Sequence, residues 1–468
     1  MAGPCHSPEE TRGDPHRVTE RPAGDEGASP TRHRALLSAI ITLIVVLSVG
    51  IYAGVSAGDG SAGDSPAGGR GRPNSADPAS AGTWVGAWSA APVGAEPGTE
   101  PTGMAGRSVR NVVHTSTAGT SARITLSNLY GQSPLTVTHA SIALAAGHDT
   151  SAAAPGTMRR LTFGGAPSVT VPAGQQVLSD AVHLQVPQGA DVLVTTYAPA
   201  ESGPVTIHPY ARQISYLADG DRVENPSATP YSQRTSVWRY LTALDVLSHD
   251  ANGTVVAFGD SITDGSTSTV GANRRWPDAF SQRLRAAVAA GQEGVPRYSV
   301  VNAGISGNQI LASHPGRPAE NQSGLTRFAR DVLGRPNVKV VVLDLGVNDT
   351  LHGADADRIL AGLRTLVRQA HAHGIKVVGA TLTPFGGYPR YTAAREAVRQ
   401  RVNAEIRSGT VYDAVVDFDK ALRDPYDPRR YAPEYDSGDH LHPSDRGYRR
   451  MAATIHLTDL KGAVPARL

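Results

Sequence analysis

Cysteine is almost absent from this sequence of 468 residues, in which Cys5 is the single example. One cysteine excludes any intramolecular disulfide bond. If the protein is exported, its stability outside the cytoplasm must therefore come from the burial of apolar side chains. Aromatic residues are also few, at 5%, whereas the chain has 50 glycines and 33 prolines. This balance favours loop-rich β structure over a helical bundle.

An excess of charge of one sign is missing as well. The 44 Lys and Arg residues stand against 42 Asp and Glu residues, and no block of like charge stands out. Nucleic-acid-binding proteins usually carry a basic patch or stripe. Nucleotide-binding motifs are also missing, because neither G-x-G-x-x-G nor G-x-x-x-x-G-K-[ST] follows a predicted strand. We therefore expect no nucleic acid as a partner. Lysine is scarce beside arginine, which hints at a GC-rich bacterial source.

The N-terminal part of the chain contains a long apolar run. Residues 1–34 are polar and rich in Pro, Arg and Glu, a composition typical of a disordered tail. Residues 35–55, ALLSAIITLIVVLSVGIYAGV, carry no charge. As a helix they would span about 31 Å, close to the roughly 30 Å hydrocarbon core of a bilayer. Arginines precede this run and aspartates follow it, so the positive-inside rule places the tail in the cytoplasm and the bulk of the chain outside.

We therefore predict a transmembrane anchor at 35–55, or a signal segment that is cleaved near residues 55–57. Both interpretations make the protein extracytoplasmic: it is either anchored by a single pass with its N-terminus inside, or secreted. Residues 56–82 are rich in Gly, Ser, Ala, Pro and Asp, and predict a flexible linker.

Residues 83–245 are predicted to form an antiparallel β-sandwich domain. Short stretches alternate apolar and polar residues, and Pro and Gly interrupt them at short intervals. Period-two alternation broken by turns is typical of sandwich strands with one buried face. The predicted strands are 123–129, 135–144, 168–171, 182–186, 191–198 and 203–208.

Residues 250–468 show a different pattern, which predicts a three-layer α/β/α domain with a parallel sheet. Continuous apolar runs alternate with helical patterns, as in sheets that helices cover on both faces. In such sheets ligands bind at the carboxyl ends of the strands, so a site is expected in the loops that follow them. The predicted strands are 254–259, 298–304, 338–346, 375–382 and 414–418, and the predicted helices are 276–290, 322–333, 355–373, 391–407 and 444–457.

Three of these loops carry groups suited to catalysis. The first contains a G-D-S sequence that ends in Ser261, at a predicted helix start that favours developing negative charge. The second, NAGISGNQ (302–309), contains glycines that leave backbone N–H groups free to point at a ligand. The third, GVND (346–349), contains Asn348, a neutral donor for an oxyanion. Each loop alone is equally well explained as an ordinary turn.

A fourth loop supplies candidates for a base and an acid. A serine nucleophile needs a base, and the base needs an acid that orients it. In DSGDHLHPSD (436–445), Asp439 and His442 could form this pair, and Asp436 and His440 are alternatives that spacing does not exclude. The same side chains could bind a metal ion, but no H-E-x-x-H motif or cysteine pair supports a metal site.

Together the four loops resemble the sequence blocks of the SGNH hydrolases, also called GDSL-type esterases and lipases, over residues 254–457. The resemblance implies a flavodoxin-like hydrolase domain and a serine esterase that hydrolyses small acyl esters without a cofactor. The site residues that it implies are Ser261 as nucleophile, Asp439 and His442 as acid and base, and Ser261, Gly307 and Asn348 as donors of the oxyanion hole.

A finer resemblance is to a bacterial branch of aryl- or acyl-esterases that often have an N-terminal β-domain. It rests on AFGDSITDGSTSTVGANRRWPDAFSQRL and VVNAGISGNQIL, and it suggests small acyl esters on carbohydrates as substrates.

Two alternative functions are an extracytoplasmic glycan-binding protein with an inactive hydrolase domain, and an O-acyltransferase. The complete set of catalytic positions argues against the glycan-binding protein. A single anchor cannot carry an acyl donor across the membrane, which argues against the O-acyltransferase. Asp260 and Asp264 are interpreted as loop-shaping residues, since a second carboxylate beside the nucleophile would oppose an oxyanion.

Overall fold

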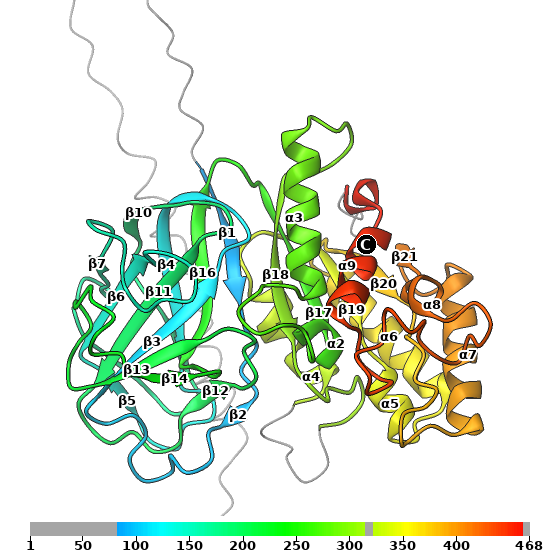
Figure 1. Ribbon diagram of the computed structural model, residues 1–468, viewed down its shortest axis with the longest axis horizontal. Helices are drawn as coiled ribbons and strands as arrows, with labels where there is room; N and C mark the ends of the chain where they lie inside the picture. The colour runs from blue at the N-terminus through cyan, green and yellow to red at the C-terminus, as the bar shows by residue number, and fades with distance from the viewer. Residues whose placement is uncertain (1–81, 314–321, 462–468) are drawn as a thin grey trace, which may run out of the picture. The chain divides into compact units, whose positions relative to one another are not determined.

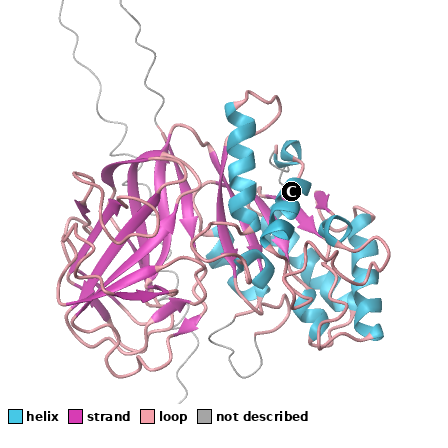
Figure 2. Cartoon of the chain, in the orientation of Figure 1, coloured by secondary structure: helices cyan, strands magenta, loops and turns pink. Residues whose placement is uncertain are grey.

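The computed structural model describes residues 82–313 and 322–461. Within these ranges antiparallel strands come first along the chain, and a parallel sheet with its helices follows (Figure 1, Figure 2). The predicted tail (1–34), the predicted anchor or signal segment (35–55) and residues 56–81 of the predicted linker lie outside the described residues. Among the residues that are described, no helix has both the length and the apolar composition needed to cross a membrane.

The antiparallel region contains two larger sheets and two smaller ones. The first larger sheet contains, in spatial order, β1 (Thr83–Ser89), β16 (Leu241–Ser248), β4 (Gly119–Ser127) and β10 (Val182–Val186), with β9 (Gln176–Leu178) also paired to β4. The second contains β14 (Gln233–Thr235), β13 (Ser215–Asp219), β3 (Arg107–His114), β11 (Asp191–Ala198), β6 (His139–Leu144) and β7 (Arg159–Arg160). The smaller sheets are β15 (Trp238–Arg239), β12 (Thr206–His208) and β2 (Gly94–Ala95), and β5 (Leu135–Val137) with β8 (Val169–Val171).

The two larger sheets share one apolar core. Val85 and Leu244 from the first sheet and Val109 and Val194 from the second are buried in the same cluster. The strands in these sheets pair antiparallel to their neighbours. Side chains from two sheets that bury their inner faces against each other make a sandwich. The predicted antiparallel β-sandwich is therefore confirmed.

Some strands of the sandwich differ from the sequence prediction. The predicted stretch 135–144 is two strands, because β5 pairs with β8 whereas β6 pairs with β11. The sequence analysis did not assign β3, in which Arg110 and Asn111 are fully buried. Arg110 reaches the backbone carbonyls of Ser151 at 2.7 Å and Asn225 at 2.9 Å. These buried polar residues interrupt the alternation by which a strand is recognised.

The parallel sheet contains, in spatial order, β18 (Tyr298–Gly304), β17 (Gly253–Gly259), β19 (Val338–Asp344), β20 (Lys376–Ala380) and β21 (Ala414–Val416). Numbered along the chain, this order is 2-1-3-4-5, that of flavodoxin-like folds. Ligands in such folds bind beyond the carboxyl ends of the strands, where the chain turns from one side of the sheet to the other. Here that position lies between β17 and β19, whose carboxyl ends are in register at Gly259 and Asp344.

Helices cover both faces of this sheet (Figure 1). On one face Val255 and Ala257 share a core with residues of α3 (Trp276–Ala289), α8 (Phe418–Leu422) and α9 (Asp445–Thr454). On the other, Val256 and Phe258 pack with α4 (Gly324–Phe328), the π-helical turn η1 (Ala329–Leu333), α6 (Ala356–His371) and α7 (Ala393–Arg407). Successive strand residues point to opposite faces, so this arrangement confirms the predicted three-layer α/β/α domain. The remaining helices are α2 (Ser261–Asp264), α5 (Val347–Leu351) and the 3₁₀ turn η2 (Leu457–Leu460).

Candidate active site

Ser261 begins α2 immediately beyond the carboxyl end of β17. The strand ends at Gly259, where an added Cβ would lie 2.1 Å from Thr263 Oγ1 and 2.7 Å from the Asp344 carbonyl oxygen, so a larger residue does not fit. Asp260 then caps α2, because its Oδ1 accepts a hydrogen bond from the Ile262 N–H at 3.0 Å. The close packing at Gly259 and the cap formed by Asp260 together fix the position of Ser261 beyond the end of β17.

Ser261, His442 and Asp439 form a continuous hydrogen-bonded chain. Ser261 Oγ lies 2.8 Å from His442 Nε2, and His442 Nδ1 lies 2.6 Å from Asp439 Oδ2. The other oxygen of Asp439 accepts the backbone N–H groups of Leu441 and His442. Partial burial opposes ionisation of this carboxyl, but the hydrogen bonds from the His442 side chain and from the two backbone groups lower the pKa of Asp439 below its usual range. An ionised Asp439 holds the Nδ1–H tautomer of His442 and leaves Nε2 to accept the Ser261 proton.

The alternative pair, Asp436 and His440, does not reach Ser261. His440 Nδ1 lies 2.6 Å from Asp436 Oδ2, and the pair is closed on itself within the same loop. The structure therefore brings His442, and not His440, to Ser261.

Asn348 lies near the carboxyl ends of β17 and β18. It is in the first turn of α5, and its Nδ2 donates to Asp260 Oδ2 at 3.2 Å and to the Asn308 carbonyl oxygen at 3.1 Å. Gly307 precedes Asn308 and has φ of +77°, a conformation that favours glycine. Because both Nδ2 protons have protein acceptors, Asn348 can bind an oxyanion by giving up or sharing one of these bonds.

Among the described residues, the Ser261 and Gly307 amides donate no hydrogen bond to a protein acceptor. An oxyanion hole is made of donors such as these, fixed before the reaction and left without a partner until charge develops. Of the three predicted donors, two are therefore amides without an acceptor among the described residues, and the third is a side chain with two acceptors.

Comparison with known proteins identifies the family. The family model described as GDSL-like Lipase/Acylhydrolase family matches residues 257–450. Esterase TesA of Pseudomonas aeruginosa is 30% identical over 172 residues, which cover 36% of this chain and 75% of that protein. The chain belongs to the GDSL-like lipase/acylhydrolase family. It is a carboxylic-ester hydrolase.

Two solved structures of esterases are also similar to part of this chain. One is Est24, a carbohydrate acetylesterase from Sinorhizobium meliloti, with 16% identity and a TM-score of 0.34. The other is the aryl esterase of M. smegmatis, with 17% identity and a TM-score of 0.34. Each comparison covers 43% of this chain and 95% of the other.

Asp260, which precedes Ser261 in this GDSL-like hydrolase, lies among buried acids. Burial, and after it the neighbouring Asp344 charge, raise the pKa of Asp260 well above its usual range. Burial also raises the pKa of Asp344 to about 6. A raised pKa favours the neutral acid, and a neutral Asp260 does not repel an oxyanion. This agrees with the sequence interpretation of Asp260 as a residue that shapes the loop.

The sequence analysis missed Arg327, which connects two loops of the site from within α4. Its fully buried guanidinium donates to the carbonyl oxygens of Gly259 and Ala303 at 2.8 Å and to Asn308 Oδ1 at 2.9 Å. An ion pair with Asp331 at 3.0 Å offsets part of the desolvation of this charge. No sequence signal marks this role, because Arg and Asp four residues apart are also common on exposed helix faces.

The described part of the GDSL-like hydrolase contains no group of three or more His, Cys, Asp or Glu side chains arranged to hold a metal ion. The side chains that the sequence offered as possible ligands are paired as Asp436 with His440 and Asp439 with His442.

Proposed function

We propose that the protein hydrolyses small acyl esters in two steps through an acyl-enzyme on Ser261. The observation that carries the proposal is the hydrogen-bonded chain from Ser261 Oγ through His442 to Asp439, with distances of 2.8 Å and 2.6 Å. A nucleophile, a base and an orienting acid in this geometry suit acyl transfer.

In the first step, His442 Nε2 takes the proton of Ser261 as Oγ attacks the ester carbonyl carbon. The bond from Oγ to carbon forms while the carbonyl π electrons move onto oxygen. His442 then gives its proton to the alcohol oxygen, the ester C–O bond breaks, and the alcohol leaves. The ionised Asp439 stabilises the imidazolium that exists between these proton transfers.

The tetrahedral oxyanion would be held by the Ser261 and Gly307 amides and by Asn348 Nδ2. Asn348 is the donor that also bonds to Asp260, at 3.2 Å, the longer of its two bonds. Exchange of this bond for one to the oxyanion makes the interaction stronger in the transition state than in the free enzyme, which is what accelerates a reaction.

In the second step, a water molecule replaces the alcohol. His442 takes one proton from the water as the water oxygen attacks the acyl carbon. His442 then gives this proton to Ser261 Oγ as the bond from Oγ to the acyl carbon breaks and the acid leaves. The reaction consumes one ester and one water, and it releases one alcohol and one acid. Carbohydrates bearing small acyl groups are the substrates that we propose, on the sequence resemblance alone.

The first test is the hydrolysis of p-nitrophenyl acetate, butyrate and octanoate by the purified chain and by Ser261→Ala. Removal of the nucleophile should lower kcat by about 10⁴-fold or more, leaving the residual catalysis of binding and the oxyanion hole. Ser437→Ala, the same change at an exposed serine of the loop that carries His442, is the matched control and should keep its activity. Equal activity of wild type and Ser261→Ala would overturn the proposal.

A second series with the same proteins addresses the substrate. Acetylated xylose and acetylated glucose are compared with p-nitrophenyl acetate by the release of acetate. A higher kcat/KM on the sugar esters supports carbohydrates as the natural alcohol, and a lower value on every sugar ester contradicts this part of the proposal.

A further inference from the structure

One carboxylate connects the antiparallel region to two loops of the active site. Asp264 is the last residue of α2, three positions after Ser261. Its Oδ1 lies 2.9 Å from Nε2 of His208, which ends β12 in the antiparallel region. Its Oδ2 accepts a hydrogen bond at 2.8 Å from Ser306 Oγ, one position before Gly307. The Asp264 side chain thus joins three parts of the molecule: α2, which begins with Ser261, the loop that contains Gly307, and the β-sandwich.

The environment of His208 fixes the position of its ring. The side chain is 4% exposed, and its other nitrogen, Nδ1, donates to the Ala91 carbonyl oxygen at 2.7 Å. The ring also lies against Trp238, with 5.5 Å between centroids. A carbonyl oxygen accepts hydrogen bonds and does not donate them, so Nδ1 carries a proton. Nε2 faces the Asp264 carboxyl group, so a second proton on the ring makes His208 and Asp264 a buried ion pair.

The loops that Asp264 joins are in close contact. An added Cβ on Gly304 would lie 2.3 Å from the Asp264 backbone nitrogen, so α2 packs directly against the end of β18. Asn302 strengthens this contact, because its Nδ2 donates to the Thr263 carbonyl oxygen at 2.7 Å. A small movement of Asp264 would therefore change the spacing between the Ser261 and Gly307 amides, which lie on the two loops that this packing joins.

We propose that His208 is a positioning residue of the esterase site and that the β-sandwich, through it, is part of the catalytic machinery. His208 holds Asp264, and Asp264 holds both α2 and Ser306, so the two backbone donors keep the spacing that an oxyanion requires. This proposal rests on the proposed function, because it concerns the oxyanion hole of that reaction. The sandwich then has a role that needs no ligand of its own.

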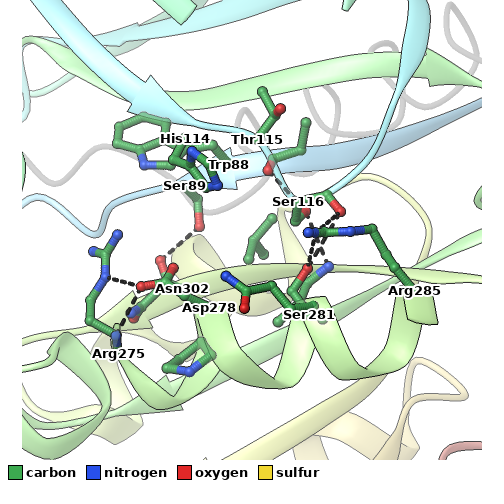
Figure 3. A pocket seen from close by; sticks show the side chains of 15 residues that line it. Trp88, Ser89, His114, Thr115, Ser116, Arg275, Asp278, Ser281, Arg285 and Asn302 are labelled. Carbon is green, nitrogen blue, oxygen red and sulfur yellow. Dashed lines mark hydrogen bonds and ion pairs between the residues drawn. The ribbon is translucent and has the colours of Figure 1, made fainter. Parts of the chain in front are cut away.

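A purely structural contact between the same two regions provides the control. Figure 3 shows Arg285, on α3, with its guanidinium turned toward Ser116 of the antiparallel region. Arg285 Nη1 donates to the Ser116 carbonyl oxygen and to Ser281 Oγ, each at 2.8 Å. Neither bond involves α2 or the loop before Gly307. Arg285→Ala therefore weakens the contact between the regions without touching the Asp264 link.

The experiment measures kcat and KM on p-nitrophenyl acetate for His208→Gln, Ser306→Ala, the double variant and Arg285→Ala. We expect kcat to fall by about 10- to 100-fold in His208→Gln with KM nearly unchanged, as for a displacement of catalytic groups of about 1 Å or less. Ser306→Ala should lower kcat in the same way. Because both residues act through Asp264, the double variant should be little worse than the poorer single variant. Arg285→Ala should lower the Tm and leave kcat unchanged.

A second readout does not depend on turnover. Diisopropyl fluorophosphate phosphorylates an activated serine: the Ser261 Oγ–P bond forms, the P–F bond breaks, and His442 takes the hydroxyl proton. The phosphoryl oxygen develops charge where the ester oxyanion would lie. The second-order rate constant for labelling should therefore fall in His208→Gln and Ser306→Ala as kcat does, and stay unchanged in Arg285→Ala.

The outcomes separate this proposal from the proposed function. A wild type that neither hydrolyses esters nor is labelled at Ser261 would overturn both. If the wild type hydrolyses esters and is labelled at Ser261, but His208→Gln and Arg285→Ala have the same kcat and labelling rate, only the positioning role of His208 is overturned. Fully additive effects of the two single variants would do the same. If His208→Gln fails to fold by circular dichroism, the smaller change Ser306→Ala decides, and an unchanged kcat in that variant overturns the proposal.

Discussion

The loop before α9 contains two histidine–aspartate pairs of nearly the same internal geometry. In each pair the histidine Nδ1 lies 2.6 Å from a carboxylate oxygen, and the second oxygen of the aspartate accepts two backbone N–H groups of the same loop. The two pairs differ in what the second ring nitrogen of the histidine, Nε2, contacts. His442 reaches Ser261 Oγ at 2.8 Å, whereas the His440 side chain is 43% exposed.

A well-formed histidine–aspartate pair is therefore not by itself a catalytic one. Asp439 and His442 are three residues apart, and Asp436 and His440 are four apart. His440 has φ of +63°, a strained conformation for a residue with a side chain. Local sequence builds both pairs, but the position of β17 decides which histidine meets the nucleophile.

A third pair, His208 with Asp264, extends the comparison to the interior. Both side chains are nearly inaccessible, at 4% and 6%, and they come from residues 56 positions apart. Histidine–aspartate pairs therefore occur away from Ser261, in contact with Ser261, and in the contact between the sandwich and the parallel-sheet region. The third group in contact distinguishes the two loop pairs, and burial of both side chains distinguishes the pair of His208 and Asp264.

The largest expected effect separates the two histidines of the loop. His442→Ala removes the base and should lower kcat on p-nitrophenyl acetate by about 10⁴-fold or more. His440→Ala, the same change two residues away, should lower it by less than about tenfold, because this ring does not touch Ser261. Steady-state kinetics of both variants provide the measurement, and comparable losses in the two would break the distinction.

The next effect separates the two acids. Asp439→Asn keeps the shape of the side chain but can donate to Nδ1, which favours the wrong tautomer of His442, so kcat should fall by about 10³- to 10⁴-fold. Asp436→Asn makes the same change in the pair that does not contact Ser261 and should cost less than about tenfold. Initial rates at several pH values test this. A loss in Asp436→Asn as large as that in Asp439→Asn would mean that the loop acts as one unit.

The smallest effect concerns the buried pair and appears in stability. Burial alone would lower the pKa of His208, but the Asp264 charge and the hydrogen bonds that the ring donates to Asp264 and to the Ala91 carbonyl raise it above 6.5, against a small opposing contribution from Arg275. A raised folded pKa gives stability that is fully present below pH 6.5 and is lost as the pH rises through the folded value.

His208→Gln should therefore be less stable than wild type by about 3 kcal/mol near pH 6, as for a broken buried ion pair. The difference should shrink as the pH rises above the folded pKa of His208. Urea unfolding of both proteins between pH 6 and pH 9 measures it, and Arg285→Ala supplies a control whose deficit has no such dependence. A His208→Gln deficit that stays constant over this range would argue against an ion pair.

Much of the fold was predictable because its signals are local. The continuous apolar runs at 254–259 and 338–346 predicted strands of a parallel sheet, and the structure has β17 and β19 there. Within the sandwich, alternation predicted strands such as 191–198, which is β11. Prediction failed in β3, where buried Arg110 is held by carbonyl groups from distant loops that no local pattern reveals.

Residue types and spacing along the chain were enough to predict the chemical groups of the candidate site and the edge of the sheet at which they lie. Ser261 follows an apolar strand, and Asp439 and His442 are close enough in sequence to bond locally, so short-range geometry limits where they can be. Tertiary structure decided which histidine meets Ser261, what Asn348 bonds to, and that His208 holds Asp264. These contacts join residues far apart along the chain, and their distances depend on how sheets and helices pack, which spacing does not encode.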